Sequence, residues 1–165
     1  MKDVMRKLCL GGLLALATVA ASAEVTVTFV ETPRFTDLPF RPWERQDVLK
    51  ELTKHFNRLG AQLPPGQNLH IRVKDIDLVG VLYPSRGIDE LRVIRHRGDW
   101  PRIDLDYTIE SNGQVLRSGE GQLRDMMFAR HVSRYSDGDN LRYEKRMIDD
   151  WFYSTIVPLD RTARR

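Results

Sequence analysis

The stretch RIDLDYTIESNGQVLRSGEGQLRD, residues 102–125, combines two strand-like segments with a tight turn between them. Apolar side chains stand at every second position of the first segment, which is typical of a strand with one buried face. Asn112-Gly113 is a strong short signal for a two-residue hairpin turn, because both residue types tolerate positive φ. The stretch therefore predicts an antiparallel hairpin, in which Ile109 faces Leu116, and it makes a β-sheet the centre of the fold.

Further segments follow the strand and helix periodicities of hydrophobic residues. In the segment 69–79, apolar residues occupy odd positions up to Val73 and even positions from Ile76 onward. Such a phase change predicts a β-bulge near Lys74 or burial on both faces. The predicted elements besides the hairpin are strands over 24–30, 69–79 and roughly 90–96, and helices over 43–59 and from Leu141 onward.

Each predicted helix has a single apolar stripe and can bury only one face. No regular alternation of strands and helices demands a parallel sheet. The sequence therefore predicts an α+β fold, with one antiparallel-rich sheet of about four to five strands and two main helices packed on one face. At this length, a single domain over residues 24–165 is expected.

The N-terminus has the three parts of an export signal. Lys2, Arg6 and Lys7 precede an apolar run over 8–20, and small residues at 21–23 offer a cleavage site. The apolar run is shorter than the roughly 20 residues of a membrane-spanning helix, and a strand pattern follows it directly. We therefore expect residues 1–23 to be a cleaved signal peptide, which leaves no membrane span in the mature chain. The alternative is a short buried or membrane-anchoring helix.

The excess of basic residues in the chain is small. There are 26 Lys and Arg residues against 23 Asp and Glu residues, and removal of residues 1–23 takes away three basic residues and Asp3, which leaves 23 against 22. The basic isoelectric point of the chain therefore does not argue for nucleic acid or an anionic membrane as a partner. The single cysteine, Cys9, belongs to the same segment, so the mature chain is expected to have neither a disulfide nor a thiol nucleophile.

The segment PSRGIDELRVIRHRGDWPR, residues 84–102, is dense in arginine and contains a tryptophan. Guanidinium groups match carboxylates and phosphates, and an aromatic ring adds a flat contact surface. Arg95, Arg97, Trp100 and Arg102 are therefore a candidate site for an anion or an acidic partner. The alternative, which we favour, is an exposed edge strand that its charges protect from aggregation.

The segment RYEKRMIDDWF, residues 142–152, is predicted to be an amphipathic helix whose charged residues mostly lie on a solvated face. Glu144 is different, because it falls within the apolar stripe near Ile148 and Trp151. A buried carboxylate needs a partner, so we expect Glu144 to be a structural acid paired with an arginine of the sheet, Arg102 being the first choice. On that hypothesis, Glu144→Gln strands the arginine and lowers the melting temperature.

No motif of a known catalytic or metal site is present in the sequence. The four histidines are scattered, and His55 lies at the edge of a helical apolar stripe, where a partly exposed residue is expected more often than a ligand. Asp75 and Asp77 share a strand face without further converging oxygens, and residues 137–140 lack the spacing of a calcium loop. We therefore expect no catalytic residue, no metal and no cofactor.

Three segments carry a resemblance to a known family: VTVTFV at 25–30, DWPRIDLDYTIE at 99–110 and LRYEKRMIDDWF at 141–152. They resemble the uncharacterised bacterial family called domain of unknown function 3016. The likeness covers nearly all of the mature chain, and its last segment is the most specific. The resemblance implies an exported protein of the Gram-negative periplasm, and it implies neither an established activity nor catalytic residues.

A non-enzymatic binding or envelope-accessory module is the function that these observations favour. A small α+β domain with an exposed sheet edge or a basic-aromatic patch can recruit peptides or polymers. Its partner is expected to be another envelope protein or an acidic polymer, and not nucleic acid. The alternative is a periplasmic hydrolase whose site assembles from scattered His, Asp and Glu residues.

Overall fold

A four-stranded sheet organises the computed structural model, which describes residues 23–83, 91–94, 98–132 and 134–157. The strand order is β1-β2-β5-β6. The pairs β2-β5 and β5-β6 are antiparallel, whereas β1 runs parallel to β2. The four strands are β1 (Val25–Phe29), β2 (Gln67–Asp77), β5 (Arg102–Ser111) and β6 (Gln114–Arg124).

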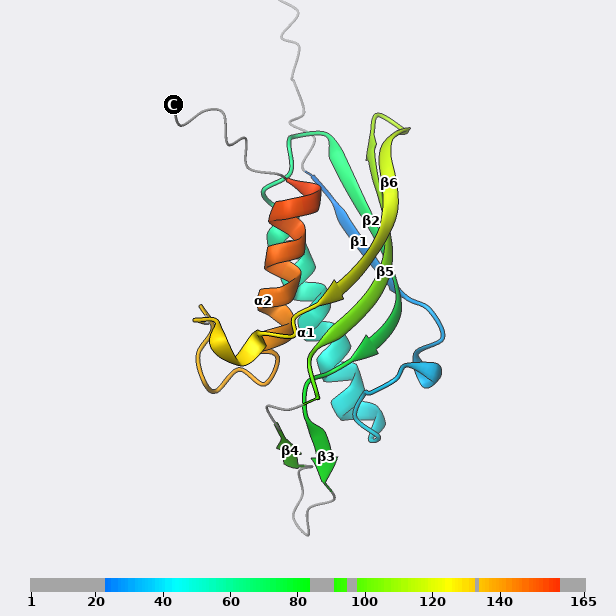
Figure 1. Cartoon of the computed structure of the whole chain (residues 1–165). Helices are drawn as coiled ribbons and strands as arrows, with labels where there is room; N and C mark the ends of the chain where they lie inside the picture. Colours follow the sequence, from blue (N-terminus) through cyan, green and yellow to red (C-terminus); the bar gives the residue numbers. More distant parts are fainter. Residues whose placement is uncertain (1–22, 84–90, 95–97, 133, 158–165) are drawn as a thin grey trace, which may run out of the picture.

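Two helices, α1 (Pro42–Gly60) and α2 (Arg142–Trp151), lie on the same face of this sheet, and a π-helical turn (Phe152–Ile156) continues α2 (Figure 1). The predicted α+β fold, with one main sheet and two helices on one face, is confirmed. The sheet is mixed because α1 connects β1 to β2, and a crossover helix of this kind returns the chain in the same direction.

The start and the buried face of α1 follow from its sequence. Pro42 occupies the first turn, where its missing N–H is not needed, and the preceding Arg41 is extended, as a residue before proline prefers. Leu52, Phe56 and Leu59 are spaced along one stripe and are buried against the sheet. The opposite, solvated side of the helix is left for polar residues.

A second, two-stranded sheet lies beyond the end of the main one (Figure 1). Its strands are β3 (Val81–Tyr83) and β4 (Leu91–Val93), which pair antiparallel. The predicted strand near 90–96 is therefore shorter than expected, and within the described residues it pairs with β3 rather than with the main sheet. This arrangement brings the side chain of Arg92 to the backbone that follows β2, where Nη1 donates to the carbonyl oxygen of Val79 at 3.3 Å.

The main sheet has two register shifts, one between β2 and β5 and one between β5 and β6. The predicted bulge in β2 is confirmed, because the pairing with β5 shifts between Val73 and Asp75. The hairpin turn is also confirmed, with Asn112 and Gly113 at φ 51° and 75°. The predicted register beyond that turn is wrong by one residue: a second shift pairs Ile109 with Arg117 instead of Leu116.

The core lies between the sheet and the two helices. Its most deeply buried side chains come from all of these elements, among them Leu52, Phe56, Leu69, Ile71, Leu105, Ile148 and Phe152. Neither helix in the described ranges combines the length and the hydrophobicity that a bilayer-crossing segment requires. Residues 1–22, which hold nearly all of the predicted signal peptide, lie outside the described residues, so cleavage and the boundary at 24 stay predictions.

Candidate functional site

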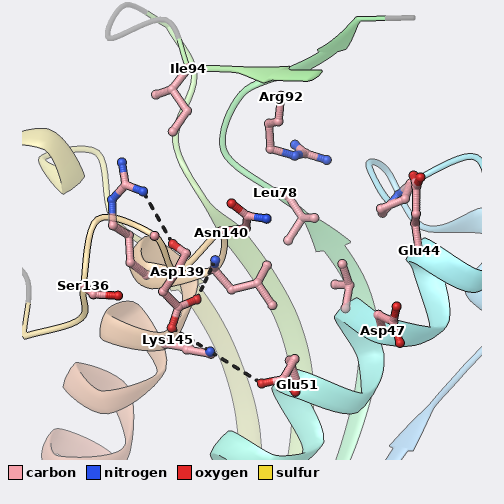
Figure 2. A pocket seen from close by; sticks show the side chains of 15 residues that line it. Glu44, Asp47, Glu51, Leu78, Arg92, Ile94, Ser136, Asp139, Asn140 and Lys145 are labelled. Carbon is pink, nitrogen blue, oxygen red and sulfur yellow. Dashed lines mark hydrogen bonds and ion pairs between the residues drawn. The ribbon is translucent and has the colours of Figure 1, made fainter. Parts of the chain in front are cut away.

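A cavity of about 870 Å³ opens between the first half of α1, the strand β4 and the loop that leads into α2 (Figure 2). Leu78, just after β2, and Ile94, just after β4, contribute apolar surface to it. Small-molecule sites usually have volumes of about 300 to 1,000 Å³ and combine apolar walls with a few polar groups. Segments that are distant in the sequence thus meet around one concave site of suitable size.

One wall of the cavity is acidic and comes from α1. Glu44, Asp47 and Glu51 are three and four residues apart, so they project from the same side of the helix. Glu44 is 3.3 Å from the guanidinium of Arg41, and Glu51 accepts a hydrogen bond from Lys54 that lowers the pKa of its carboxyl. Asp47 is exposed, and its carboxylate forms no hydrogen bond or ion pair with any of the residues that the structure describes.

The opposite wall is formed by the loop just before α2 and by the first turn of that helix. Asp139 accepts hydrogen bonds from the backbone N–H of Leu141 at 2.9 Å and from Nζ of Lys145 at 2.7 Å. Burial opposes ionisation of Asp139, but these hydrogen bonds outweigh it and lower the pKa of the carboxyl. Lys145 also reaches Glu51 at 3.8 Å, so it links the two walls (Figure 2).

Arg92 closes the end of the cavity from β4. Its Nη1 is fully used: it donates to Oδ2 of Asp37 at 2.8 Å and to the carbonyl oxygens of Val79 and Gly80 at 3.3 and 3.1 Å. Its Nη2 is buried and has no hydrogen-bond partner among the described residues. A buried donor without an acceptor is unfavourable by roughly 1 to 3 kcal/mol, so Nη2 of Arg92 is a donor whose demand the described residues do not meet.

Glu144 bonds to the same backbone segment as Arg92, and only 1% of its surface is exposed. Its Oε1 accepts a hydrogen bond from the backbone N–H of Val79 at 2.9 Å, and its Oε2 has no partner in the described part of the chain. Burial raises the pKa of the Glu144 carboxyl to about 7, against the opposing effect of the hydrogen bond from Val79. We refer to Val79, Arg92 and Glu144 as the open junction.

The expected ion pair between Glu144 and Arg102 is wrong. Arg102 donates from Nε to Oδ2 of Asp77 at 2.7 Å, because the register of β2 and β5 places these two residues directly opposite each other. Glu144 instead projects from α2 towards the end of β2, where a backbone N–H is its partner. The prediction that Glu144→Gln destabilises the protein by stranding an arginine therefore loses its physical basis.

The structure places only half of the arginine-tryptophan cluster. Arg95 and Arg97 lie outside the described residues. The guanidinium carbon of Arg102 lies 5.6 Å from the ring centre of Trp100, a cation-π contact, while the charge of Arg102 is balanced by Asp77. The hypothesis that this cluster binds an anion stays a prediction.

A second buried polar cluster joins α1 to α2 beside a smaller cavity of about 160 Å³. His55, on α1, donates from Nε2 to Oδ1 of Asp149 at 2.9 Å and to the carbonyl oxygen of Lys145 at 3.0 Å, while its Nδ1 accepts from Arg58 at 2.8 Å. Tyr135 donates to Oδ2 of Asp149 at 2.6 Å and accepts from Arg58 at 2.9 Å. We refer to His55, Arg58, Tyr135 and Asp149 as the closed cluster.

The environment of the closed cluster changes the acidity of two of its members. Burial raises the pKa of the Tyr135 hydroxyl, and the hydrogen bond to Asp149 adds to this rise. Burial also opposes ionisation of Asp149, but the hydrogen bonds from His55 and Tyr135 are stronger and lower the pKa of its carboxyl. Both His55 ring nitrogens and both Asp149 oxygens are bonded, so this geometry offers no free base to a substrate.

Sequence reasoning missed both the buried His55 and the cavity. His55 was expected at a partly exposed edge, whereas it is 3% exposed because Tyr135 and α2 cover it. The sequence did contain a signal for the buried His55. Arg58 follows His55 by three residues and Asp149 follows Lys145 by four, so each pair lies on one face of its helix. Two such polar faces can pack against each other. For Arg92, no local pattern indicates that β4 turns its side chain towards the cavity.

The described residues include no group of three or more His, Cys, Asp or Glu side chains that converge as metal ligands do. Asp75 accepts hydrogen bonds from the backbone N–H and the hydroxyl of Thr36, both at 2.7 Å. Asp77 is paired with Arg102. These two neighbouring carboxylates of β2 therefore stabilise a loop and a strand pair.

Comparison with known proteins shows a family without an assigned activity. A search of the curated proteins finds no match. Among solved structures, the chain is similar to one from Helicobacter pylori that is described as a neuraminyllactose-binding hemagglutinin homologue. The identity is 10%, the match covers 84% of this chain and 80% of that one, and the TM-score of 0.27 is too low to carry an argument. The model of a protein family of unknown function, DUF3016, matches residues 23–154, and the chain belongs to that family.

Proposed function

We propose that this protein is an exported binding module and that the cavity between α1, β4 and the loop before α2 is its ligand site. The observation that carries the proposal is the cavity itself, with a volume of about 870 Å³, an apolar floor and charged walls of both signs. Such a composition is typical of a site that orients a polar ligand by a few directed contacts.

A binding role fits the chemistry of the cavity better than a hydrolytic one. A hydrolase needs a nucleophile or an activated water beside a base that can take its proton. In the described ranges, the histidine closest in sequence to the acidic wall is His55, and both of its ring nitrogens are occupied by Arg58, Asp149 and Lys145. None of the histidines in the described part of the chain is bonded to a carboxylate of the acidic wall, so these carboxylates serve as acceptors.

Export is the second part of the proposal. It is supported by the basic residues, the apolar run over 8–20 and the small residues at 21–23. The test is the intact mass of the protein from a periplasmic extract. We expect the mass of a chain that begins at Glu24, and retention of residues 1–23 would contradict export by a cleaved signal.

The binding role is tested by amide chemical-shift mapping of the protein against a panel of peptides, amino sugars and acidic polymers. We expect at least one panel member to shift amides of residues 44–51 and 136–142 in a saturable manner, because these segments form the two walls. A panel that shifts only other surfaces, or turnover of a panel member by the protein, would contradict the proposal. The turnover result would favour the hydrolase alternative.

A further inference from the structure

One carboxylate of the acidic wall has no protein cation bonded to it. Glu44 is paired with Arg41 at 3.3 Å, and Glu51 is paired with Lys54 and lies 3.8 Å from Lys145. The carboxylate of Asp47, in the middle of the wall, forms no ion pair with any residue that the structure describes. A ligand cation can therefore bind Asp47 without displacing a protein cation.

The other polar groups of the cavity are suited to amide recognition. Nη2 of Arg92 is a donor without an acceptor, and the side chain of Asn140 forms no hydrogen bond with any described residue. Figure 2 shows both side chains between the two walls, near Leu78. An asparagine amide can donate to a carbonyl oxygen and accept from an N–H at once, and a guanidinium donates to a carbonyl or a carboxylate. These are the groups of a peptide backbone.

Apolar surface lies between the charged groups. Val48 on α1, Leu78, Ile94 and Leu141 all line the cavity. The side chains of lysine and arginine bury their methylene groups on apolar surface while they keep the charged end at a polar rim. The alternation of apolar floor and acidic wall therefore suits a long cationic side chain better than a compact inorganic cation.

An anionic ligand fits the cavity less well, because its cations are already in use. Lys145 is bound to Asp139, and Arg142 donates to the carbonyl oxygens of Asp137 and Asp139 at 3.0 and 3.5 Å. Nη1 of Arg92 is bound to Asp37. Of Lys145, Arg142 and Arg92, only Arg92 has a buried side-chain nitrogen, Nη2, without an acceptor among the described residues. One donor suits a single carbonyl better than a polyanion.

Resting on the function proposed above, we infer that the ligand is a short cationic peptide. Its lysine or arginine side chains bind the carboxylates of Glu44 and Asp47, and its backbone carbonyl groups bind Arg92 and Asn140. The geometry assigns the peptide's charge to the α1 wall and its backbone to the β4 side.

The experiment measures binding of a fluorescent Lys-Lys-Lys peptide and of the same peptide with its three side chains acetylated, by anisotropy at low salt. Asp47→Asn and Glu44→Gln remove charge from the acidic wall while keeping the size of the side chains. Asp150→Asn is the matched control, because Asp150 is on the exposed side of α2 with 68% of its side chain accessible. Amide shift mapping of the bound complex locates the peptide on the protein.

We expect the cationic peptide to bind and the acetylated peptide to bind at least about tenfold more weakly, since charge-assisted hydrogen bonds are lost. Asp47→Asn and Glu44→Gln should each weaken binding by about three- to tenfold, and Asp150→Asn by less than about twofold. Equal affinity for both peptides, or unchanged affinity in both wall variants, overturns the inference. If the peptide fails to bind while another ligand shifts residues 44–51 and 136–142, the inference falls and the proposed function stands.

Discussion

The closed cluster and the open junction are both polar regions with buried members that join α2 to other elements, yet they differ in how completely their polar atoms are bonded. In the closed cluster, the two ring nitrogens of His55 and the two carboxylate oxygens of Asp149 are all bonded. In the open junction, Oε2 of Glu144 and Nη2 of Arg92 are buried without a partner among the described residues. The first region holds two helices together, whereas the second leaves unmet polar demand at Glu144 and at Arg92, which lines the cavity.

This difference separates structural polar groups from candidates for function. A fully bonded network gains stability from every member and has nothing left to offer a ligand. A buried group without a partner lowers stability, so its presence next to a cavity is explained more easily by a ligand than by folding. Changes in the closed cluster should therefore alter stability, and changes in the open junction should alter proton or ligand binding.

The largest expected effect is the loss of stability in His55→Ala. This change removes a buried ring and takes one hydrogen-bond partner each from Asp149, Arg58 and the backbone carbonyl of Lys145, so we expect the free energy of unfolding to fall by about 3 to 4 kcal/mol. Chemical denaturation measures it. The control is His70→Ala, because 42% of the His70 side chain is exposed, and it should lose less than about 1 kcal/mol. Similar losses in the two variants would remove the distinction on which the closed cluster rests.

The next effect concerns the pH dependence of Glu144. Its pKa is about 7 in the folded protein against an ordinary value of 4.5, so between these pH values the folded protein keeps a proton that the unfolded chain has released. Stability from this group is complete below pH 4.5 and is lost as the pH rises through 7, by about 3 kcal/mol in total.

Glu144→Gln cannot ionise and keeps an acceptor for the N–H of Val79. The stability difference between this variant and the wild-type protein should therefore shift in favour of the variant by about 3 kcal/mol between pH 4.5 and pH 8. Denaturation curves at several pH values measure it. A difference that stays constant over this range would show that Glu144 is solvated or paired with a cation.

A smaller effect is expected for Tyr135→Phe, which keeps the ring and removes the hydroxyl. Asp149 then loses the hydrogen bond of 2.6 Å and Arg58 loses an acceptor, so the unfolding free energy should fall by about 1 to 2 kcal/mol. A double-mutant cycle with Asp149→Asn measures the coupling. Independent, additive effects of the two changes would contradict a single connected network.

The smallest expected change in stability is that of the triple variant Arg95→Ala, Arg97→Ala and Arg102→Ala. Arg102 is 44% exposed on its side chain, so loss of its ion pair with Asp77 should lower stability by less than about 1 kcal/mol. If the cluster binds an acidic partner, a short polyglutamate peptide should bind the wild-type protein at low salt and the triple variant more weakly. Salt-insensitive binding, or unchanged affinity in the variant, would favour the protected edge strand.

The sheet and its helices were predictable because their signals are local. Alternation along β5, the Asn112-Gly113 turn and the apolar stripe of α1 each need only a short window of sequence. The bulge in β2 was visible as a phase change around Lys74 for the same reason. The register of β6 was missed because its extra residue lies in a segment without alternation, where no phase change marks it.

The candidate site was less predictable, since its groups meet only after folding. The position of Glu144 within an apolar stripe correctly drew attention to that residue, but its partner is a backbone N–H at the end of β2, and backbone groups carry no residue-specific signal. Arg102 was assigned to the wrong acid because its pairing with Asp77 depends on the register of β2 and β5. The position of Arg92 depends on the separate β3–β4 sheet.

The most direct test of the contrast between the open junction and the closed cluster is a carbon-13 NMR titration of the side-chain carboxyl groups of Glu144 and Asp149 in one sample. We expect a midpoint near pH 7 for Glu144, because burial favours its protonated form and outweighs the hydrogen bond from Val79 and the charge of Arg92. For Asp149 we expect a midpoint below the ordinary aspartate value, because its two donors favour the ionised form. A Glu144 midpoint near the ordinary value of 4.5 would contradict the account, since it would mean that the open junction is already satisfied by solvent or by a cation.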